Sequence, residues 1–596
     1  MQNKIKSLYL FTAISLLMFN NSCNDKRLDI LPLNILTSYQ IFGSESGITA
    51  YMASLYAQLP IEDFTFRGWG QDLANYTDES VASSSTEVNG IPDGTWLQWW
   101  GYAQIRNVNN LIEKLPTAKI ADIKKKSLLG EAKFIRAFDY FELVKLYGGV
   151  PIIKTVQSVN GDNIGELQVP RNTEKEVWDF IATDLDSAVS LLPETNESGR
   201  ATKYAALALK SRAMLYAASS AKYGSVMLNG LNGIPSSQAD NYWKSSYDAA
   251  KLIINSGAYS LYNKNTNKEL NFEQLFIDQS NPEAIFSRYY HYPDKTHLYD
   301  QFNLPFGVRA PTGYGSGVGP YLELVEQFEY IDGTPGKLHL KNPDGSPIFY
   351  TKPTDLFLNK DPRCMATVIV PFGVYKGSVI DVQAGIYDQG IKFEAGDYSS
   401  LYNPTTHQPD NTNGTIHIVG NNGFGSGATE KSQSGFYLRK YLDYNLPQSR
   451  AQASDQAWIV FRYGEVLLNY AEAAIELKNI EDAKSAINEI RDRAGIKLLG
   501  DAEVTLDKVR HERLVELAFE NQRWWDYRRW RVSDKILNNV RFSSLKPYYD
   551  INAKAYRFEA GIAGRWPKTF LVRTYYEAIP TIEISKNPNL IQNSGY

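Results

Sequence analysis

Apolar residues recur at helical spacing in two long blocks of the chain. In the first block they fall three or four positions apart over 102–115 and again over 121–147, where Phe134, Phe138 and Phe141 mark one face. This spacing predicts a helix over each range. A pair of glycines and a proline follow directly and predict the end of the second helix.

Capping signals mark further helices in the first block. Thr173 and Glu176 form a Thr-x-x-Glu capping box, and an apolar period follows it as far as Leu192. The alanine-rich stretch RATKYAALALKSRAMLYAA predicts a helix that lets its neighbours approach closely. Another helix is expected over 242–256, with Gly257 as its cap.

The second helical block lies near the end of the chain, over 463–478 and 481–494. Two helices per unit of about 30 to 40 residues is the pattern of tetratricopeptide repeats. Residues 258–457 separate the blocks and are rich in Gly, Pro, Asn, Asp and Tyr, with short β-prone runs among them. The sequence therefore predicts an all-α dominated fold, in which a helical scaffold over about 100–257 and 458–532 carries a long, loop-rich insertion. Binding surfaces usually lie on loops that a rigid scaffold positions.

The first 22 residues have the pattern of a lipoprotein signal peptide. Two lysines precede the apolar run Leu8–Phe19, and small polar residues follow it. The run is shorter than the roughly 20 residues of a membrane-spanning helix. Cleavage after Ser22 makes Cys23 the first mature residue and a site for lipid, although Asn20 stands where a lipobox usually has leucine. The alternative is ordinary cleavage nearby, with Cys23 an incidental thiol.

Composition adds three constraints. The formal net charge of −4 argues against nucleic-acid binding, which depends on cationic side chains that release counterions. Cys364 has no cysteine partner once Cys23 is lipidated, so it is expected to be a small buried apolar residue. Aromatic residues make up 13% of the chain, with 39 Tyr, 26 Phe and 11 Trp. Aromatics in this number suit a surface that holds a ligand by flat apolar faces.

Several stretches resemble successive blocks of the SusD/RagB family, in the family's order and as far as the last residue. They are GEAKFIRAFDYFELVKLYGGVPII, GRATKYAALALKSRAMLYAA, FRYGEVLLNYAEAAIELKN, AINEIRDRAGI, HERLVELAFENQRWWDYRRW and AIPTIEISKNPNLIQNSGY. The chain departs from the family at Asn521 and Gln522, where glycine is more frequent, which concerns the local turn only.

The resemblance implies an outer-membrane lipoprotein whose mature chain, 23–596, forms one domain anchored by Cys23 and facing the cell exterior. Four tetratricopeptide-like helix pairs are implied, with an oligosaccharide held on an irregular part over about 33–99, 258–457 and 533–596. The implied partner is a SusC-like TonB-dependent transporter, which the protein caps and to which it passes its glycan. No cofactor, metal or catalysis is implied.

The resemblance also implies where the glycan sits, in an aromatic arc built from the region before the first repeat and from loops of the insertion. Trp69 lies between two glycines outside any helical period, which favours an exposed platform, and Trp96 is the second candidate. Trp99 and Trp100 are expected to be core residues. The other predicted contacts are Asp72, Asn75, Tyr289, Tyr290, Tyr292 and Tyr314.

Charged residues in the quoted blocks are expected to support the scaffold and not to catalyse a reaction. Glu131 and Arg136 lie on an amphipathic helix, and Glu512, Arg513 and Glu516 are expected to form ion pairs or cap helices. The 66 acidic residues single out no glycosidase pair, which needs two carboxylates about 5 to 10 Å apart. The six histidines are scattered, which argues against a His-rich metal site.

Two other functions stay open at this point. Tyrosine-rich surfaces also suit peptides, so a peptide-binding member of the same family is one alternative. A lipid-anchored glycoside hydrolase is the other.

Overall fold

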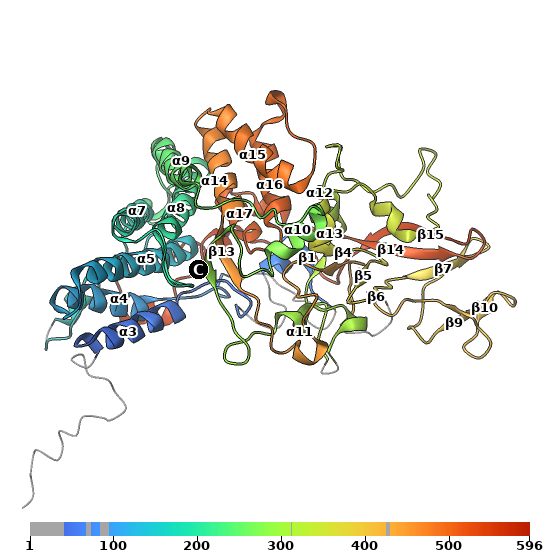
Figure 1. Ribbon diagram of the computed structural model, residues 1–596, viewed down its shortest axis with the longest axis horizontal. Helices are drawn as coiled ribbons and strands as arrows, with labels where there is room; N and C mark the ends of the chain where they lie inside the picture. The colour runs from blue at the N-terminus through green and yellow to red at the C-terminus, as the bar shows by residue number, and fades with distance from the viewer. Residues whose placement is uncertain (1–40, 67–72, 84–93, 162, 311–312, 425–429) are drawn as a thin grey trace, which may run out of the picture.

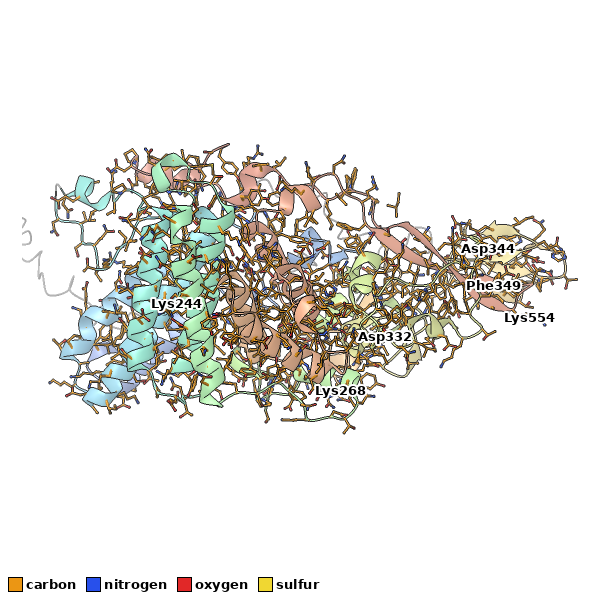
Figure 2. The ribbon with its side chains drawn as sticks, turned by 90° about the horizontal axis from the view of Figure 1, so that it is seen from above. Lys244, Lys268, Asp332, Asp344, Phe349 and Lys554 are labelled. Carbon is orange, nitrogen blue, oxygen red and sulfur yellow. The ribbon has the colours of Figure 1, made fainter. Side chains whose placement is uncertain are left out.

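The computed structural model describes residues 41–66, 73–83, 94–161, 163–310, 313–424 and 430–596. The molecule is elongated, with long helices in one half and small sheets joined by loops in the other (Figure 1). Figure 2 shows Lys244 on the helical half and Lys554 near the opposite tip.

The first helical block contains the helices that the apolar spacing predicts. α4 (Tyr102–Lys114) and α5 (Asp122–Tyr147) differ from the predicted ranges by one residue at an end. α9 (Ala239–Ser256) begins three residues earlier than predicted and ends at Gly257, whose backbone is left-handed at φ 63°. The structure confirms these predictions. Local periodicity and capping residues set the helix boundaries, which is why the sequence alone predicts them closely.

The capping box is present where the sequence places it. α7 (Glu174–Leu191) begins after Thr173, whose side chain accepts a bond from the Glu176 N–H, while the Glu176 carboxylate accepts one from the Thr173 N–H at 2.8 Å. The alanine-rich stretch forms α8 (Lys203–Tyr223). Its small side chains let α8 pack against both α7 and α9.

The second helical block continues the first across the insertion. α14 (Tyr463–Glu476) packs against α9 of the first block, against α15 (Ile480–Ala494) and against α16 (Leu506–Leu517). The insertion therefore leaves the scaffold and returns to it. The structure therefore confirms the prediction of a helix-dominated fold. The grouping of the helices into four tetratricopeptide-like pairs stays a prediction.

A strand pair closes the base of the insertion. β2 (Ala284–Arg288) follows the first helical block and pairs antiparallel with β13 (Trp458–Arg462), which leads directly into α14. Farther out, β14 (Ser543–Asp550) and β15 (Ala555–Ile562) form an antiparallel pair in a four-stranded sheet with the order β15-β14-β7-β8, in which β15 is an edge strand.

The remaining helices and strands are short, apart from α3 beside the helical block. The helices are α3 (Glu45–Ala57), α6 (Ile164–Leu167), α10 (Lys268–Leu275), α11 (Tyr299–Asn303), α12 (Leu322–Gln327), α13 (Pro362–Thr367), α17 (Arg523–Arg529), α18 (Ser533–Ile536) and α19 (Thr581–Lys586). The strands are β1 (Ser80–Val81), β3 (Gly319–Pro320), β4 (Val368–Ile369), β5 (Val374–Tyr375), β6 (Ser378–Val379), β7 (Gly385–Asp388), β8 (Ile391–Phe393), β9 (Leu401–Asn403), β10 (Gln408–Pro409), β11 (Ile416–His417) and β12 (Tyr437–Leu438).

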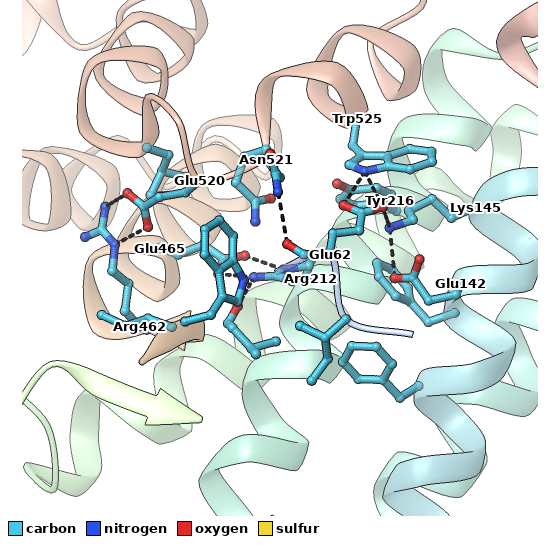
Figure 3. Close-up of a pocket in the computed structure, with 18 residues that line it drawn as sticks. Glu62, Glu142, Lys145, Arg212, Tyr216, Arg462, Glu465, Glu520, Asn521 and Trp525 are labelled. Carbon is cyan, nitrogen blue, oxygen red and sulfur yellow. Dashed lines mark hydrogen bonds and ion pairs between the residues drawn. The ribbon is translucent and has the colours of Figure 1, made fainter. Parts of the chain in front are cut away.

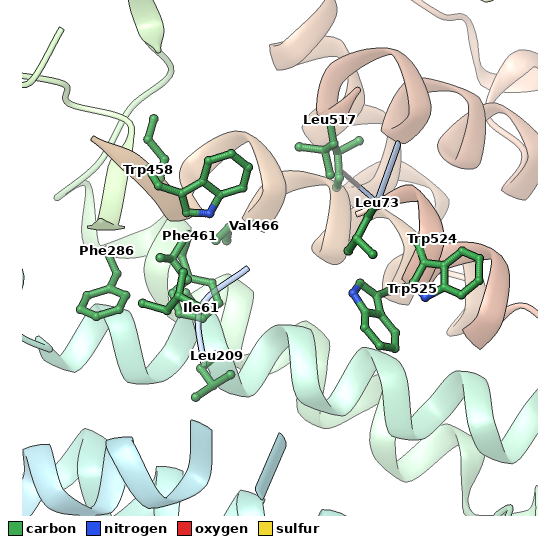
Figure 4. Close-up of a cluster of buried hydrophobic side chains, with 14 of the residues drawn as sticks. Ile61, Leu73, Leu209, Phe286, Trp458, Phe461, Val466, Leu517, Trp524 and Trp525 are labelled. Carbon is green, nitrogen blue, oxygen red and sulfur yellow. The ribbon is translucent and has the colours of Figure 1, made fainter. Parts of the chain in front are cut away.

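The main apolar core spans the junction between the two halves. Figure 4 shows Leu209 of α8, Phe286 of β2 and Trp458 of β13 in this cluster, together with Trp524 and Trp525 of α17. Because helices and insertion strands share this core, the base of the insertion is held firmly on the scaffold. Cys364 is also buried, as predicted, and burial raises the pKa of its thiol to about 12.

The acidic and basic side chains of the quoted blocks are paired in the core, which supports their structural interpretation. Glu516 on α16 is fully buried and meets Arg462 at 2.7 Å, Arg363 at 2.9 Å and also Arg493. Burial opposes ionisation of Glu516, but the three guanidiniums outweigh it and hold the pKa of its carboxyl well below the usual range. This cluster joins α13, β13, α15 and α16.

Asn521 follows the same helix and occupies a left-handed position. Its φ of +59° is in the region that glycine favours and asparagine tolerates. The side chain donates from Nδ2 to the Glu62 carbonyl at 2.9 Å. Asparagine is therefore compatible with the left-handed conformation of this turn. Within the described ranges, no helix combines the length and apolar character needed to cross a membrane.

Candidate ligand-binding surface

The chain turns sharply where it leaves β2, and this turn places three of the predicted tyrosines. His291 and Lys295 exchange backbone hydrogen bonds of 2.7 and 2.8 Å, which close the turn. Tyr289, Tyr290 and Tyr292 therefore point in different directions, although they are close in sequence. The side chains at 289 and 292 are exposed, and the one at 290 is buried.

Tyr292 offers an aromatic face to solvent. The guanidinium carbon of Arg450 lies 3.9 Å from the ring centroid and covers one face, yet 45% of the residue is exposed. Asp455 holds both partners: one of its carboxylate oxygens lies 3.2 Å from Arg450 and accepts a hydrogen bond from the Tyr292 N–H at 3.4 Å. A ring fixed on one side and open on the other is a suitable platform for a flat apolar ligand face.

Tyr289 borders a groove of about 370 Å³ on the other side of the turn. This volume lies within the range of small-molecule sites, about 300 to 1,000 Å³. The groove is lined by one face of α3, by residues 197–200 between α7 and α8, and by the end of β2. Its apolar floor includes Met52, Leu59 and Phe286, all buried.

Two guanidiniums of the groove are already paired with carboxylates. Arg288 meets Asp63 at 2.8 Å, and Arg200 meets Glu131 at 2.7 Å and Glu197 at 3.2 Å. Burial alone would raise the pKa of the Asp63 carboxyl, but Arg288 and the bonds from Thr65 and Tyr290 lower it below its usual value. These ion pairs fix the walls of the groove.

Two of the predicted contacts are buried, contrary to their assignment to a surface. Tyr290 is 4% exposed and donates from Oη to Asp63 at 2.7 Å. Asn75 is also 4% exposed; its Nδ2 donates to the Gly317 carbonyl at 3.0 Å, and its Oδ1 accepts from Ser80 at 2.8 Å. Both side chains are therefore engaged in hydrogen bonds within the fold and do not form part of an exposed surface. Burial depends on contacts far apart in the chain, which the tyrosine-rich sequence does not reveal.

The other predicted contacts are partly buried or lie outside the described residues. Trp96 packs between Tyr76, at 4.1 Å between ring centroids, and Trp524, at 5.7 Å. Tyr314 is half-buried with its ring 5.8 Å from that of Phe302. Trp99 and Trp100 are also half-buried against the core, in line with their prediction. Cys23, Trp69 and Asp72 lie outside the described residues.

Described residues on both sides of segment 67–72 contact the chain that follows the turn. Phe64 stacks on His297, with 4.1 Å between ring centroids. After the segment, Asn75 bonds to the Gly317 carbonyl. The region before the first repeat and the insertion therefore meet beside the tyrosine turn. Ligand contact by Trp69 and Asp72 stays a prediction.

The sequence reasoning missed two residues of interest. Arg450 carries no local signal, because it acts through Tyr292 in a distant part of the chain. Trp566, 48% exposed, follows β15 in the stretch AGRWPK, where a tryptophan between arginine and proline lies outside any helical period. Nearby, Lys568 donates to the Ser80 carbonyl at 3.1 Å, which places this loop beside the 73–83 segment.

A polar cavity at the base of the insertion is too small for a sugar. Figure 3 shows Glu62, Glu142, Lys145 and Trp525 around it. Lys145 meets Glu142 at 2.8 Å and Glu62 at 3.1 Å, and the cavity volume of about 40 Å³ has room for a few waters at most. Burial raises the pKa of Glu142 to about 7, although Lys145 opposes this.

Among the described residues, no group of three or more His, Cys, Asp or Glu side chains is arranged to hold a metal.

Two family models match the chain. The model described as the SusD family matches residues 282–596, and a model described as starch-binding associating with outer membrane matches residues 35–215. Together they cover most of the chain and leave residues 216–281, which include α9, outside both matches.

Relatives and solved structures match over nearly the full length. SusD-like protein P2 of Formosa agariphila is 24% identical over 99% of both chains, and a SusD-like protein of Bacteroides ovatus is 23% identical over 93% of this chain and 87% of the relative. The crystal structure of a SusD-like protein from Bacteroides fragilis has a TM-score of 0.69 at 25% identity, covering 94% and 99% of the two chains. A SusD-like carbohydrate binding protein from the same species has a TM-score of 0.65 at 22% identity, covering 92% and 100%.

Proposed function

Because the chain belongs to the SusD/RagB family, whose model matches residues 282–596, we propose that it is a non-catalytic surface protein that binds glycan around Tyr289 and Tyr292. The Tyr292 platform carries this proposal. Its ring is held from behind by Arg450 and open in front, and the groove beside Tyr289 lies on the other side of the same turn.

The geometry suits a weak, reversible contact. Stacking one sugar face on an aromatic ring removes roughly 50 Å² from water, which contributes about 1.3 kcal/mol at roughly 25 cal/mol per Å². A few such contacts with hydrogen bonds give micromolar to millimolar dissociation constants. That range suits a protein that releases its ligand to a partner.

The comparisons support a glycan over other ligands. One matched family is described as starch-binding and associated with the outer membrane, and one solved structure of the same fold is titled a carbohydrate binding protein. We extend this only to the class of ligand, and not to starch itself.

The location and the partner are part of the same proposal. Lipid on Cys23 would hold the protein at the outer membrane, facing the cell exterior, and a SusC-like TonB-dependent transporter would receive the glycan. Replacement of Cys23 by alanine is expected to release the protein from the membrane fraction. Retention of the variant in that fraction would rule out lipidation at this residue.

Isothermal titration with purified polysaccharides, oligosaccharides and peptides tests the ligand class. We expect an oligosaccharide to bind in the micromolar to millimolar range, and binding of peptides alone would identify the peptide-binding alternative. The ligand that binds is then incubated with the protein and assayed for new reducing ends. Release of reducing ends would identify a hydrolase and contradict the proposal.

A further inference from the structure

The groove beside Tyr289 has two sides of different character. On α3, Thr49, Met52, Ala53 and Tyr56 lie on one helical face, and all four line the groove. On the opposite side, Gly199 adopts a φ of +80°, and a Cβ added there would come 3.6 Å from the Tyr289 ring. The loop backbone thus lies against the tyrosine and leaves its ring at the edge of the groove.

One cation of the groove has no carboxylate of a described residue in contact with it. The guanidiniums of Arg200 and Arg288 are neutralised by buried or half-buried carboxylates, as described above. Lys295 also lines the groove, but it forms no ion pair with any residue that the structure describes. Its ammonium lies 5.2 Å from the Tyr290 ring centroid. The neighbouring acid, Asp294, is oriented toward His291 at 3.7 Å.

The electrostatics at Lys295 favour an added anion. Partial burial and then the Arg288 guanidinium lower the pKa of Lys295, and Asp63 opposes this only in part. An anion placed at the ammonium would relieve this repulsion. Exposed hydroxyl groups, such as that of Ser198, line the same groove and can bond to a sugar.

We propose that this groove binds an acidic sugar residue, with its carboxylate or sulfate on the Lys295 ammonium and its ring against Tyr289. The inference rests on the proposed glycan-binding function and narrows it to anionic glycans. It assigns the two sides of the turn different tasks. Tyr292 contacts a ring without regard to charge, and the groove selects for the acid.

The test compares matched acidic and neutral ligands by isothermal titration of the full mature chain. One pair is trigalacturonate and its fully methyl-esterified form; the other is a sulfated carrageenan tetrasaccharide and its desulfated form. We expect the acidic member of at least one pair to bind about tenfold or more tightly than its neutral form, a difference of about 1.4 kcal/mol. Raising the NaCl concentration should weaken the binding of the acidic ligand and leave the binding of the neutral form unchanged.

Lys295→Gln is expected to remove the preference for the acidic over the neutral ligand while leaving the affinity for the neutral form unchanged. The matched control is Lys244→Gln on α9, an exposed lysine that does not line the groove and should keep the preference for the acidic ligand. Preference in the first pair identifies a carboxylate as the ligand group, and preference in the second identifies a sulfate.

Two results would overturn the inference. Equal binding of acidic and neutral forms, or an unchanged preference in Lys295→Gln, would remove the charge selection and leave the proposed glycan-binding function standing. Failure of both acidic probes to bind would also overturn it, even if a neutral glycan from the wider panel binds. Failure of every glycan would overturn both proposals.

Discussion

Replacement of Glu516 by glutamine tests the ionic centre that joins the insertion to the scaffold. This carboxylate is fully buried and forms ion pairs with three guanidiniums. It lies 2.7 Å from Arg462 and 2.9 Å from Arg363, and it also contacts Arg493. Glutamine keeps the shape but removes the charge and turns an amide donor toward the guanidiniums. Removing one partner of a buried ion pair costs about 3 to 5 kcal/mol, so we expect a loss of that size in the free energy of unfolding.

The pH dependence of the free energy of unfolding gives a second, independent test. The pKa of Glu516 is held well below its unfolded value, so its contribution is complete above the unfolded pKa of about 4.3 and is lost as pH falls through the folded pKa. The difference between wild type and Glu516→Gln should therefore be constant from about pH 8 to pH 5 and shrink in stronger acid.

Urea unfolding of wild type and variant at equal slope m measures the effect. The control is Asp248→Asn, which breaks the exposed Lys244–Asp248 pair at 2.6 Å and should cost less than about 0.5 kcal/mol. A cost for Glu516→Gln below about 1 kcal/mol at pH 7, or equal to that of the control, would refute the assignment of this cluster as a structural centre.

Three further predictions follow from the same structure. Thr173→Ala removes the capping box of α7 and should destabilise the protein by about 1 kcal/mol in urea unfolding, whereas no change would show that the cap is redundant. Asp139 is fully buried with no hydrogen-bond partner for its carboxyl among the described residues, and burial followed by Glu142 raises its pKa well above the usual value. The folded state therefore retains a proton that the unfolded state loses above about pH 3.9, so Asp139→Asn should stabilise the protein at pH 7 but not near pH 4; an equal effect at both pH values would contradict this. Arg450→Gln frees the covered face of Tyr292 and should weaken binding of the glycan found by titration about threefold to tenfold without a large change in melting temperature, and unchanged affinity would remove the Tyr292 platform from the site.

Local signals made the scaffold predictable. The capping box at Thr173, the glycine after α9 and the apolar spacing of α5 each act within a few residues, so the sequence alone places these helices closely. The buried role of Glu516 follows from the same logic, because a charge on the apolar side of a helix needs an internal partner.

The surface is less predictable because long-range contacts build it. The Tyr292 N–H and its Asp455 acceptor are 163 positions apart, and the groove combines α3, the loop before α8 and the end of β2. Tyr289, Tyr290 and Tyr292 have nearly the same sequence context, yet the turn exposes two and buries one. Composition therefore indicates an aromatic surface without choosing its members.

The central claim is that the open rings of the tyrosine turn hold a glycan by contact. Titration of the oligosaccharide that binds best into wild type, Tyr292→Ala and Phe349→Ala tests this most directly, because Phe349 is 43% exposed but lies at the distal tip (Figure 2). We predict at least a tenfold loss of affinity for Tyr292→Ala, with the melting temperature nearly unchanged, and wild-type affinity for Phe349→Ala. Full affinity in Tyr292→Ala, or an equal loss in both variants, would contradict the claim.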